Sequence, residues 1–353
     1  MTTLEMNLEL LKNYKGKPIK IMEVCGTHTT AIFKAGIKEL ISPRIQLISG
    51  PGCPVCVTPT SYIDRLVELC LKENTCVLSF GDMLKVNGTS LSLSSAKAKG
   101  GQVRLIYSPL QALELAEKSP STLFVVAAVG FETTIPSYAL LIESIIEKNI
   151  KNIKILTSLK TVAPAVCFIC EHENDIDGFL CPGHVSVIIG SKAYESLAEK
   201  YKKPFVVVGF EAQPILAAIL DIIYQLEDKK SEMINFYKST VSDDGNIKAQ
   251  EIIAKYFVEY DALWRGIGKI SGSGLTLRDE FAFLEASETK DEYDKEIKNC
   301  SCSEVILGKR SPQDCPLFGK TCTPTSPVGA CMVSTEGACG IYYRFGKGVN
   351  HDY

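Results

Sequence analysis

The chain has 353 residues, 46% of them hydrophobic, which is enough to bury two or three cores. Its net charge of −3 gives no reason to expect a nucleic acid or an anionic membrane as a partner. The N-terminus lacks the pattern of a signal peptide and no apolar run is long enough to span a bilayer, so we expect a cytoplasmic protein. Fourteen cysteines in such a protein favour metal binding or redox chemistry over a disulfide framework.

The first two-thirds of the chain alternates short apolar segments with amphipathic ones. The expected strands are 20–25, 45–49, 76–80, 103–107, 123–129, 153–159, 185–189 and 205–208. They are rich in Val and Ile and mostly apolar on both faces, which is typical of strands covered by helices on both sides. Amphipathic segments such as 62–71 and 138–147 are expected helices. The alternation predicts doubly wound, parallel α/β sheets.

Eight strands are too many for one small unit, so we expect two Rossmann-like α/β domains, 1–120 and 121–230. After residue 230 the composition changes. An expected helix at 233–260 is followed by turn signals at 271–274, a charged stretch at 285–298 and a cysteine-rich tail. We therefore expect a third, smaller domain, 231–353, that is largely helical and irregular.

The tail favours an iron–sulfur cluster. It contains six cysteines: Cys300, Cys302, Cys315, Cys322, Cys331 and Cys339. Irregular backbone rich in Gly and Pro allows four thiolates to converge on a cluster. A structural zinc site also takes four cysteines, but it usually contains two close pairs, and only Cys300 and Cys302 are near neighbours here. The spacing leaves zinc or unligated cysteines open, and it does not identify which four of the six are ligands.

A second group of cysteines lies near the N-terminus, in Gly-Pro-Gly-Cys53-Pro-Val-Cys56. The Cys-x-x-Cys spacing puts the two sulfurs within reach of a disulfide, and such pairs often have a lowered thiol pKa. The segment follows the expected strand at 45–49 and precedes an expected helix after Pro59, whose N-terminus would stabilise a thiolate. The motif favours a redox role, with half of a zinc site as the alternative.

Three further segments carry reactive side chains. Cys25 and His28 follow the first strand, and a thiolate with a nearby imidazole suits nucleophilic catalysis or metal binding. His28 is otherwise an ordinary loop or core histidine. His184, in Cys-Pro-Gly-His, belongs to a site or to a simple turn. Cys167 and Cys170 lie in a helix-like segment, which favours a core role.

Together these motifs resemble the HypD family of hydrogenase maturation proteins along essentially the whole chain. The segments that carry the resemblance are Cys-Gly-Thr-His at 25–28, Gly-Pro-Gly-Cys-Pro-Val-Cys at 50–56, Gly-Phe-Glu-Thr-Thr at 130–134, Pro-Gly-His-Val-Ser at 182–186 and the cysteines of 300–339. The heptapeptide at 50–56 and the spacing of the tail are the most specific of these.

The resemblance implies a redox-active scaffold, rather than a conventional turnover enzyme, for assembly of the Fe(CN)2CO unit of NiFe hydrogenases. Its partners would be a HypC-like chaperone that brings iron and a HypE-like cyanide donor, and we expect a monomer on its own. The implied ligands of a 4Fe–4S cluster are Cys300, Cys315, Cys322 and Cys339. Electrons would pass between this cluster and the redox pair, which maps onto Cys53 and Cys56.

The resemblance further implies that Cys25 holds the iron of the Fe(CN)2CO unit, with His28 nearby. His28 and His184 would then handle protons or orient the ligands, and Glu336 would contact the site from the tail. Two rival functions remain open. One is an iron–sulfur-dependent thiol–disulfide reductase acting on a partner protein, which leaves Cys25 without a role. The other is a zinc-stabilised interaction module.

Overall fold

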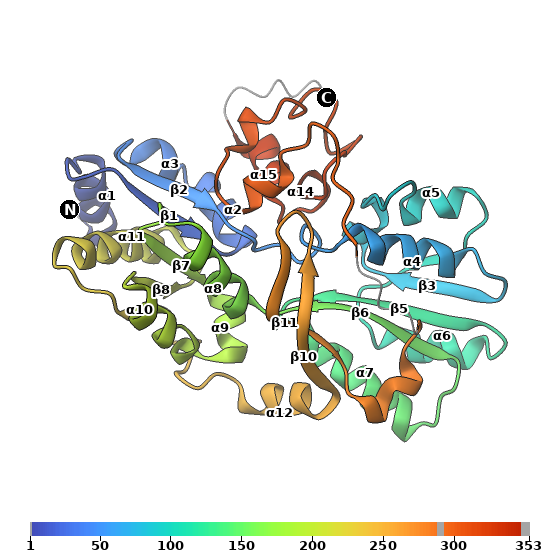
Figure 1. Cartoon of the computed structure of the whole chain (residues 1–353). Coiled ribbons are helices and arrows are strands. Elements are labelled where there is room, and N and C mark those ends of the chain that lie inside the picture. The colour runs from blue at the N-terminus through green and yellow to red at the C-terminus, as the bar shows by residue number, and fades with distance from the viewer. Residues whose placement is uncertain (1, 288–292, 347–353) are drawn as a thin grey trace.

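Two sheets organise the chain in the computed structural model, which describes residues 2–287 and 293–346 (Figure 1). The first sheet has the strand order β2 (Ile45–Ser49), β1 (Ile19–Glu23), β7 (Gly178–Pro182), β8 (Phe205–Val208) and β9 (Met233–Asn235). The second has the order β10 (Phe257–Trp264), β11 (Gly268–Leu277), β6 (Ile153–Lys160), β5 (Leu123–Gly130), β3 (Thr75–Ser79) and β4 (Val103–Leu105). All pairs in the first sheet are parallel, and in the second sheet only β11 is antiparallel to its neighbours.

Helices cover both faces of each sheet. On the first sheet, one face is covered by α1 (Thr3–Lys12), α2 (Gly26–Lys34), α3 (Ile37–Leu40) and α11 (Ala212–Glu227), and the other by α8 (Val162–His172), α9 (Gly183–Ile189) and α10 (Glu195–Tyr201). On the second, one face is covered by α4 (Thr60–Cys70) and α5 (Leu93–Ala98), and the other by α6 (Gln111–Lys118), α7 (Ile135–Glu147) and α12 (Ile247–Tyr256). Short 3-10 helices are η1 (Gly81–Lys85), η2 (Ser191–Tyr194), η3 (Asp279–Leu284) and η4 (Pro312–Asp314).

The burial pattern explains this arrangement. Val125 and Val126 are neighbours in β5, both are fully buried, and they belong to cores on opposite faces of the sheet. Side chains alternate between the faces of a strand, so a strand that is apolar at every position requires cover on both sides. The predicted α/β class with mostly parallel sheets is confirmed.

The two sheets do not divide the chain at the expected boundaries. β1 and β2 pair with β7 and its neighbours, with Ile21 opposite Gly178, whereas β3 to β6 lie on both sides of residue 120 in the sequence. Strands after residue 230 join both sheets, because β9 extends the first and the β10–β11 hairpin extends the second. The pattern of apolar residues identifies strands but carries no information on which strands pair.

Two local predictions were wrong. The segment 185–189 is not a strand but part of α9, and the strand lies just before it, in β7. The expected helix at 233–260 contains β9, α12 and the start of β10, and the turn signals at 271–274 lie within β11. Gly272 has a φ of 62° there, and the register shifts on the partner strand between Tyr260 and Ala262, so these glycines mark an irregular hairpin rather than a turn.

The C-terminal part is small and irregular. Its helices are α13 (Cys302–Ile306), α14 (Ala330–Val333) and α15 (Ala338–Phe345). In Figure 1 these red elements lie between the two sheets, where α15 contacts α2 and α14 contacts η1. Residues 288–292, within the expected charged stretch, and 347–353 lie outside the described residues. Among the described helices, none combines the length and the apolar character needed to cross a bilayer.

Candidate functional site

Cys25 lies at the carboxyl end of β1, where it is the N-cap residue of α2. Burial raises the pKa of its thiol, although the backbone N–H groups of His28 and Thr27 act in the opposite direction by hydrogen-bonding to the sulfur. The loop after β2 packs directly on this residue. A Cβ atom at Gly52 would lie only 2.5 Å from the Cα atom of Cys25, so glycine is needed for this approach.

Cys53 and Cys56 form a disulfide in the turn between β2 and α4, with Cα atoms 5.3 Å apart. Both are nearly inaccessible, at 4% and 2% exposure. The Cys56 N–H donates to the Cys53 sulfur at 3.2 Å, and the Cys56 sulfur lies 3.8 Å from the carbonyl oxygen of Ala330. The pair is therefore packed against α14 of the C-terminal part.

Glu336 reaches the same place from the tail. The hydroxyl of Thr27 donates to its carboxylate at 3.3 Å, and a Cβ atom at Gly26 would lie 2.2 Å from its backbone oxygen. Burial raises the pKa of Glu336. Asp82 holds the segment in position, because it accepts a hydrogen bond from the hydroxyl of Ser334 at 2.8 Å. Sequence reasoning missed Asp82, which has no recognisable motif.

A small hollow brings these three segments together. Its lining residues are Gly26, Thr29, Ser49, Gly50, Pro51, Cys53, Cys56, Ile306, Cys331, Glu336 and Ala338. The fold thus joins the start of α2, the turn after β2 and the tail, and Cys25 lies next to the hollow, directly before Gly26. The carboxyl ends of adjacent parallel strands commonly form such a crevice.

The two histidines both contact one aromatic ring, that of Phe210. The ring centroids of His28 and His184 are 4.8 and 4.3 Å from that of Phe210. His28 is fully buried, and its Nε2 lies 3.1 Å from the carbonyl oxygens of both Val208 and Gly209. Burial lowers its pKa to about 4, so the ring is neutral and Nε2–H donates to β8. His184 is exposed at the start of α9, not before a strand as expected.

The tail cysteines gather around a second hollow. It is lined by Cys300, Cys302, Cys315, Phe318, Cys322, Gly329, Cys331, Met332 and Cys339. Cys302 and Cys331 form a disulfide, with Cα atoms 6.3 Å apart, and the other four cysteines of the hollow are free. In the part of the chain that the structure describes, no three His, Cys, Asp or Glu side chains lie close enough together to hold a single metal ion.

The second hollow provides hydrogen bonds to sulfur. The Val328 N–H donates to the Cys322 sulfur at 3.3 Å. For Cys315, burial acts to raise the pKa of the thiol, but hydrogen bonds from Ser301, Leu317 and Phe318 outweigh it and the pKa is lowered. Four free thiols in a largely apolar hollow, with N–H donors to sulfur, fit a 4Fe–4S cluster. They fit a single zinc ion less well, because zinc needs all four sulfurs about 2.3 Å from one point.

A buried ion pair is linked to the first hollow through Thr29, and sequence reasoning missed it. Glu23, at the end of β1, is fully buried, and its carboxylate lies 3.6 Å from the ammonium of Lys38. Lys38 also donates to the hydroxyl of Tyr342 in α15 at 2.7 Å. Thr29 donates its hydroxyl to Glu23 as well. The only signal in the sequence is a charged residue at the end of an apolar strand.

Three other polar or thiol side chains line neither hollow. Glu132 follows β5 and is 5% exposed, and it accepts a hydrogen bond from the Val162 N–H at the start of α8 at 2.8 Å. Burial raises the pKa of Glu132 to about 7. Cys170 is buried in α8 as expected, whereas Cys167 is half-buried, with its sulfur 3.0 Å from the hydroxyl of Tyr201.

Comparison with known proteins agrees along the whole chain. The family described as "HypD: Hydrogenase formation hypA family" matches residues 3–346. The hydrogenase maturation factor HypD of Escherichia coli is 40% identical over 334 residues, which cover 93% of this chain and 90% of the relative. The hydrogenase maturation factor HypD of Rhodobacter capsulatus is 39% identical over 339 residues, which cover 94% of this chain and 90% of the relative. A putative hydrogenase expression/formation protein of Methanocaldococcus jannaschii is 39% identical over 330 residues, which cover 93% of this chain and 92% of the relative.

Proposed function

Because the chain belongs to the HypD family of hydrogenase maturation factors, we propose that it is a redox-active scaffold on which the Fe(CN)2CO unit of NiFe hydrogenases is assembled. The observation that carries the proposal is the convergence of the Cys25 segment, the Cys53–Cys56 pair and Glu336 around one hollow. A site for cargo iron, a redox pair and an acid lie together there, next to a second hollow with four free thiols.

Cys25 is the proposed iron ligand. A soft thiolate suits iron that is to accept strong-field ligands such as cyanide and CO. Burial keeps the thiol of Cys25 protonated, so iron binding releases a proton. The backbone N–H groups of Thr27 and His28 then stabilise the thiolate. Glu336, held beside Thr27, acts on Cys25 through its charge and can take up this proton.

The Cys53–Cys56 disulfide is the proposed redox partner of this site. Its reduction consumes two electrons and two protons and yields two thiols. Cys300, Cys315, Cys322 and Cys339 would hold a 4Fe–4S cluster that supplies one electron at a time, so full reduction of the disulfide requires an external electron donor to reduce the cluster twice. For a dithiol couple a shift of about 30 mV is about 1.4 kcal/mol, so modest changes in packing around the pair change which form dominates. The Cys56 sulfur lies 3.8 Å from the carbonyl oxygen of Ala330, so the pair is in contact with the tail.

The partners follow from family membership. Maturation factors act on hydrogenases together with other maturation proteins, and we infer a HypC-like chaperone that brings iron and a HypE-like donor of cyanide. A cysteine of the chaperone would be the second thiolate ligand of the iron beside Cys25. His184 is exposed next to Phe210, so it is available to a docking partner.

The proposal is tested by anaerobic purification of the chain together with its chaperone. We expect about four iron and four sulfide per chain from the cluster, and infrared bands of cyanide and CO from the cargo. Cys25→Ala should lose the infrared bands and keep the cluster. Cys76→Ala, in the core of the second sheet, is the matched control and should keep both. Bands that persist in Cys25→Ala would contradict the assigned iron ligand.

The two rival functions are less well supported. A thiol–disulfide reductase for proteins needs an accessible sulfur, whereas Cys53 and Cys56 are almost completely buried. If the rival were correct, Cys25→Ala would still reduce a protein disulfide. A zinc-stabilised module would give a colourless protein, whereas a cluster absorbs broadly near ~400 nm.

A further inference from the structure

The turn of the β10–β11 hairpin carries a buried arginine that the proposed function does not use. Arg265 is 5% exposed, and it contacts the loop of the redox pair. Its backbone N–H donates to the carbonyl oxygen of Val57, the residue after Cys56, at 2.8 Å. Its two terminal nitrogens each donate to the carbonyl oxygen of Asn87 at 3.2 Å. A buried arginine that hydrogen-bonds to two separate loops restricts their movement relative to each other.

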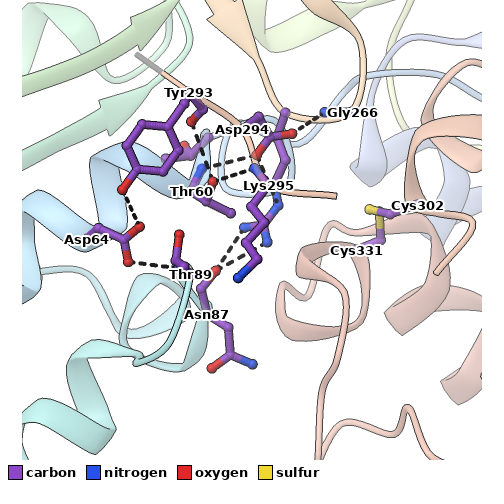
Figure 2. Close-up of polar contacts among 12 residues, drawn as sticks. Thr60, Asp64, Asn87, Thr89, Gly266, Tyr293, Asp294, Lys295, Cys302 and Cys331 are labelled. Atoms are coloured by element: carbon purple, nitrogen blue, oxygen red, sulfur yellow. Dashed lines mark hydrogen bonds and ion pairs between the residues drawn. A yellow bond between two sulfur atoms is a disulfide. The ribbon is translucent and has the colours of Figure 1, made fainter. Parts of the chain in front are cut away.

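Arg265 also contacts the segment that leads into the cysteine-rich tail. Its Nε lies 4.0 Å from the carboxylate of Asp294. That carboxylate accepts hydrogen bonds from the backbone N–H of Thr60 at 3.1 Å and of Gly266 at 2.8 Å, and Figure 2 shows these contacts joining Asp294 to both residues. The start of α4, the hairpin turn and the segment before Cys300 are thereby held together.

The same turn lies against the hollow of the tail cysteines. A Cβ atom at Gly266 would lie 2.9 Å from the Cβ atom of Ser303, the residue after Cys302 in α13. This contact places Arg265, the residue before Gly266, beside the segment that contains Cys300 and Cys302. Burial lowers the pKa of Arg265, and the charge of Asp294 acts against that shift. An arginine keeps its charge in proteins, so this positive charge is permanent.

We propose that Arg265 is a positioning residue for electron transfer, which fixes the loop of the redox pair against the tail and stabilises the reduced form of the cluster there. The inference rests on the proposed function and deepens it. Reduction adds one electron to the cluster and makes it more negative. A buried positive charge nearby favours that form, because charges interact strongly where water is excluded.

The test compares Arg265→Gln with Arg265→Lys. Each chain is loaded with iron and sulfide without oxygen, and the midpoint potential of the cluster is measured by titration with dithionite. We expect Arg265→Gln to reduce the ratio of reduced to oxidised cluster about tenfold at the wild-type midpoint, which is about 59 mV for one electron. Arg265→Lys keeps the charge and should keep the wild-type potential. Arg278→Gln removes an exposed charge after the same hairpin and is the matched control.

The outcomes separate the two proposals. Wild-type potential in Arg265→Gln, or an equal shift in Arg278→Gln, overturns the inference and leaves the proposed function intact. A merely structural arginine would lower the cluster content of the Gln and Lys variants alike without changing the potential, which also overturns it. Loss of the cluster in Arg265→Gln with retention in Arg265→Lys supports the role of the charge. A wild-type chain that takes up no cluster contradicts the proposed function, and this inference with it.

Discussion

The backbone oxygen of Glu336 lies so close to Gly26 that a Cβ atom there would be 2.2 Å from it. This contact joins the tail to the start of α2, one residue from Cys25. It involves backbone on both sides, so no side chain can rotate away to make room. The distance between the proposed iron ligand and the proposed acid is therefore set by the absence of a single methyl group.

We expect Gly26→Ala to destabilise the fold by about 1–3 kcal/mol, the usual cost of overpacking, and to displace Glu336 from Cys25. Chemical denaturation measures the first effect, and the rate of alkylation of Cys25 measures the second. Gly81→Ala is the matched control, because its added Cβ would make an ordinary contact 3.5 Å from Leu105. Equal stability and equal alkylation in Gly26→Ala and wild type would contradict the geometry.

We expect Lys38→Met to cost about 3 kcal/mol, because it leaves the fully buried carboxylate of Glu23 without its cation. Urea unfolding measures this loss. Lys148→Met is the control, since its pair with Glu117 is exposed on both sides and should change stability by less than about 0.5 kcal/mol. Adding Glu23→Gln to Lys38→Met should restore part of the loss, and a double variant no more stable than the single one would refute the pairing.

Glu132 should make stability depend on pH. Its pKa is about 7 in the folded chain and lower when unfolded, so the unfolded state releases its proton first and stability falls as the pH rises from about 4.5 to 7. A shift of this size is roughly 3 kcal/mol at most. Glu132→Gln can still accept the Val162 N–H, so it should be more stable than wild type at pH 8 and equal at pH 4.5.

The control for this prediction is Glu211→Gln. Glu211 stands in the corresponding Gly-Phe-Glu turn after β8, but it is exposed and makes no capping hydrogen bond. Its replacement should change stability equally at both pH values. The free energy of unfolding of wild type, Glu132→Gln and Glu211→Gln is measured from unfolding curves at pH 4.5 and pH 8. A gain for Glu132→Gln that is the same at both pH values would exclude ionisation as its cause.

The ligand set of the cluster can be tested with two single substitutions in the tail. Cys339→Ser removes a free thiol from the hollow and should abolish binding of iron and sulfide. Cys331→Ser removes a disulfide partner from the same hollow and should leave the cluster in place. Iron and sulfide analysis after anaerobic loading is the measurement. The reverse pattern would show that the assigned set is wrong.

The sequence predicted the class of fold because its signal is local. Runs such as 123–129 are apolar at every position, and that pattern has few interpretations in an α/β chain. The pairing of β1 with β7 was not predictable, since nothing in either segment specifies a distant partner. The strand predicted at 185–189 failed because a short apolar run fits a buried helix equally well.

The candidate site was predictable only in part. Cys25, Cys53 and Cys56 stand in distinctive motifs, whereas Glu336 was proposed only from its position between Cys331 and Cys339. Glu23 carries no such signal, because its importance arises from burial and from an ion pair with a residue on another element. Arg265 is similar, since its contacts come from segments far apart in the chain. Networks of this kind become visible only in three dimensions.

The interleaved order of the strands determines when the redox loop can form during synthesis. The first sheet needs β7 and β8 to hold β1 and β2, so it cannot form before about three-fifths of the chain has been made. The Cys53–Cys56 turn lies where the chain first crosses from one sheet to the other, and its contacts with Arg265 and Ala330 come later still. Until then the two sulfurs lack these contacts. Most of the chain must therefore be synthesised before the redox pair makes its native contacts.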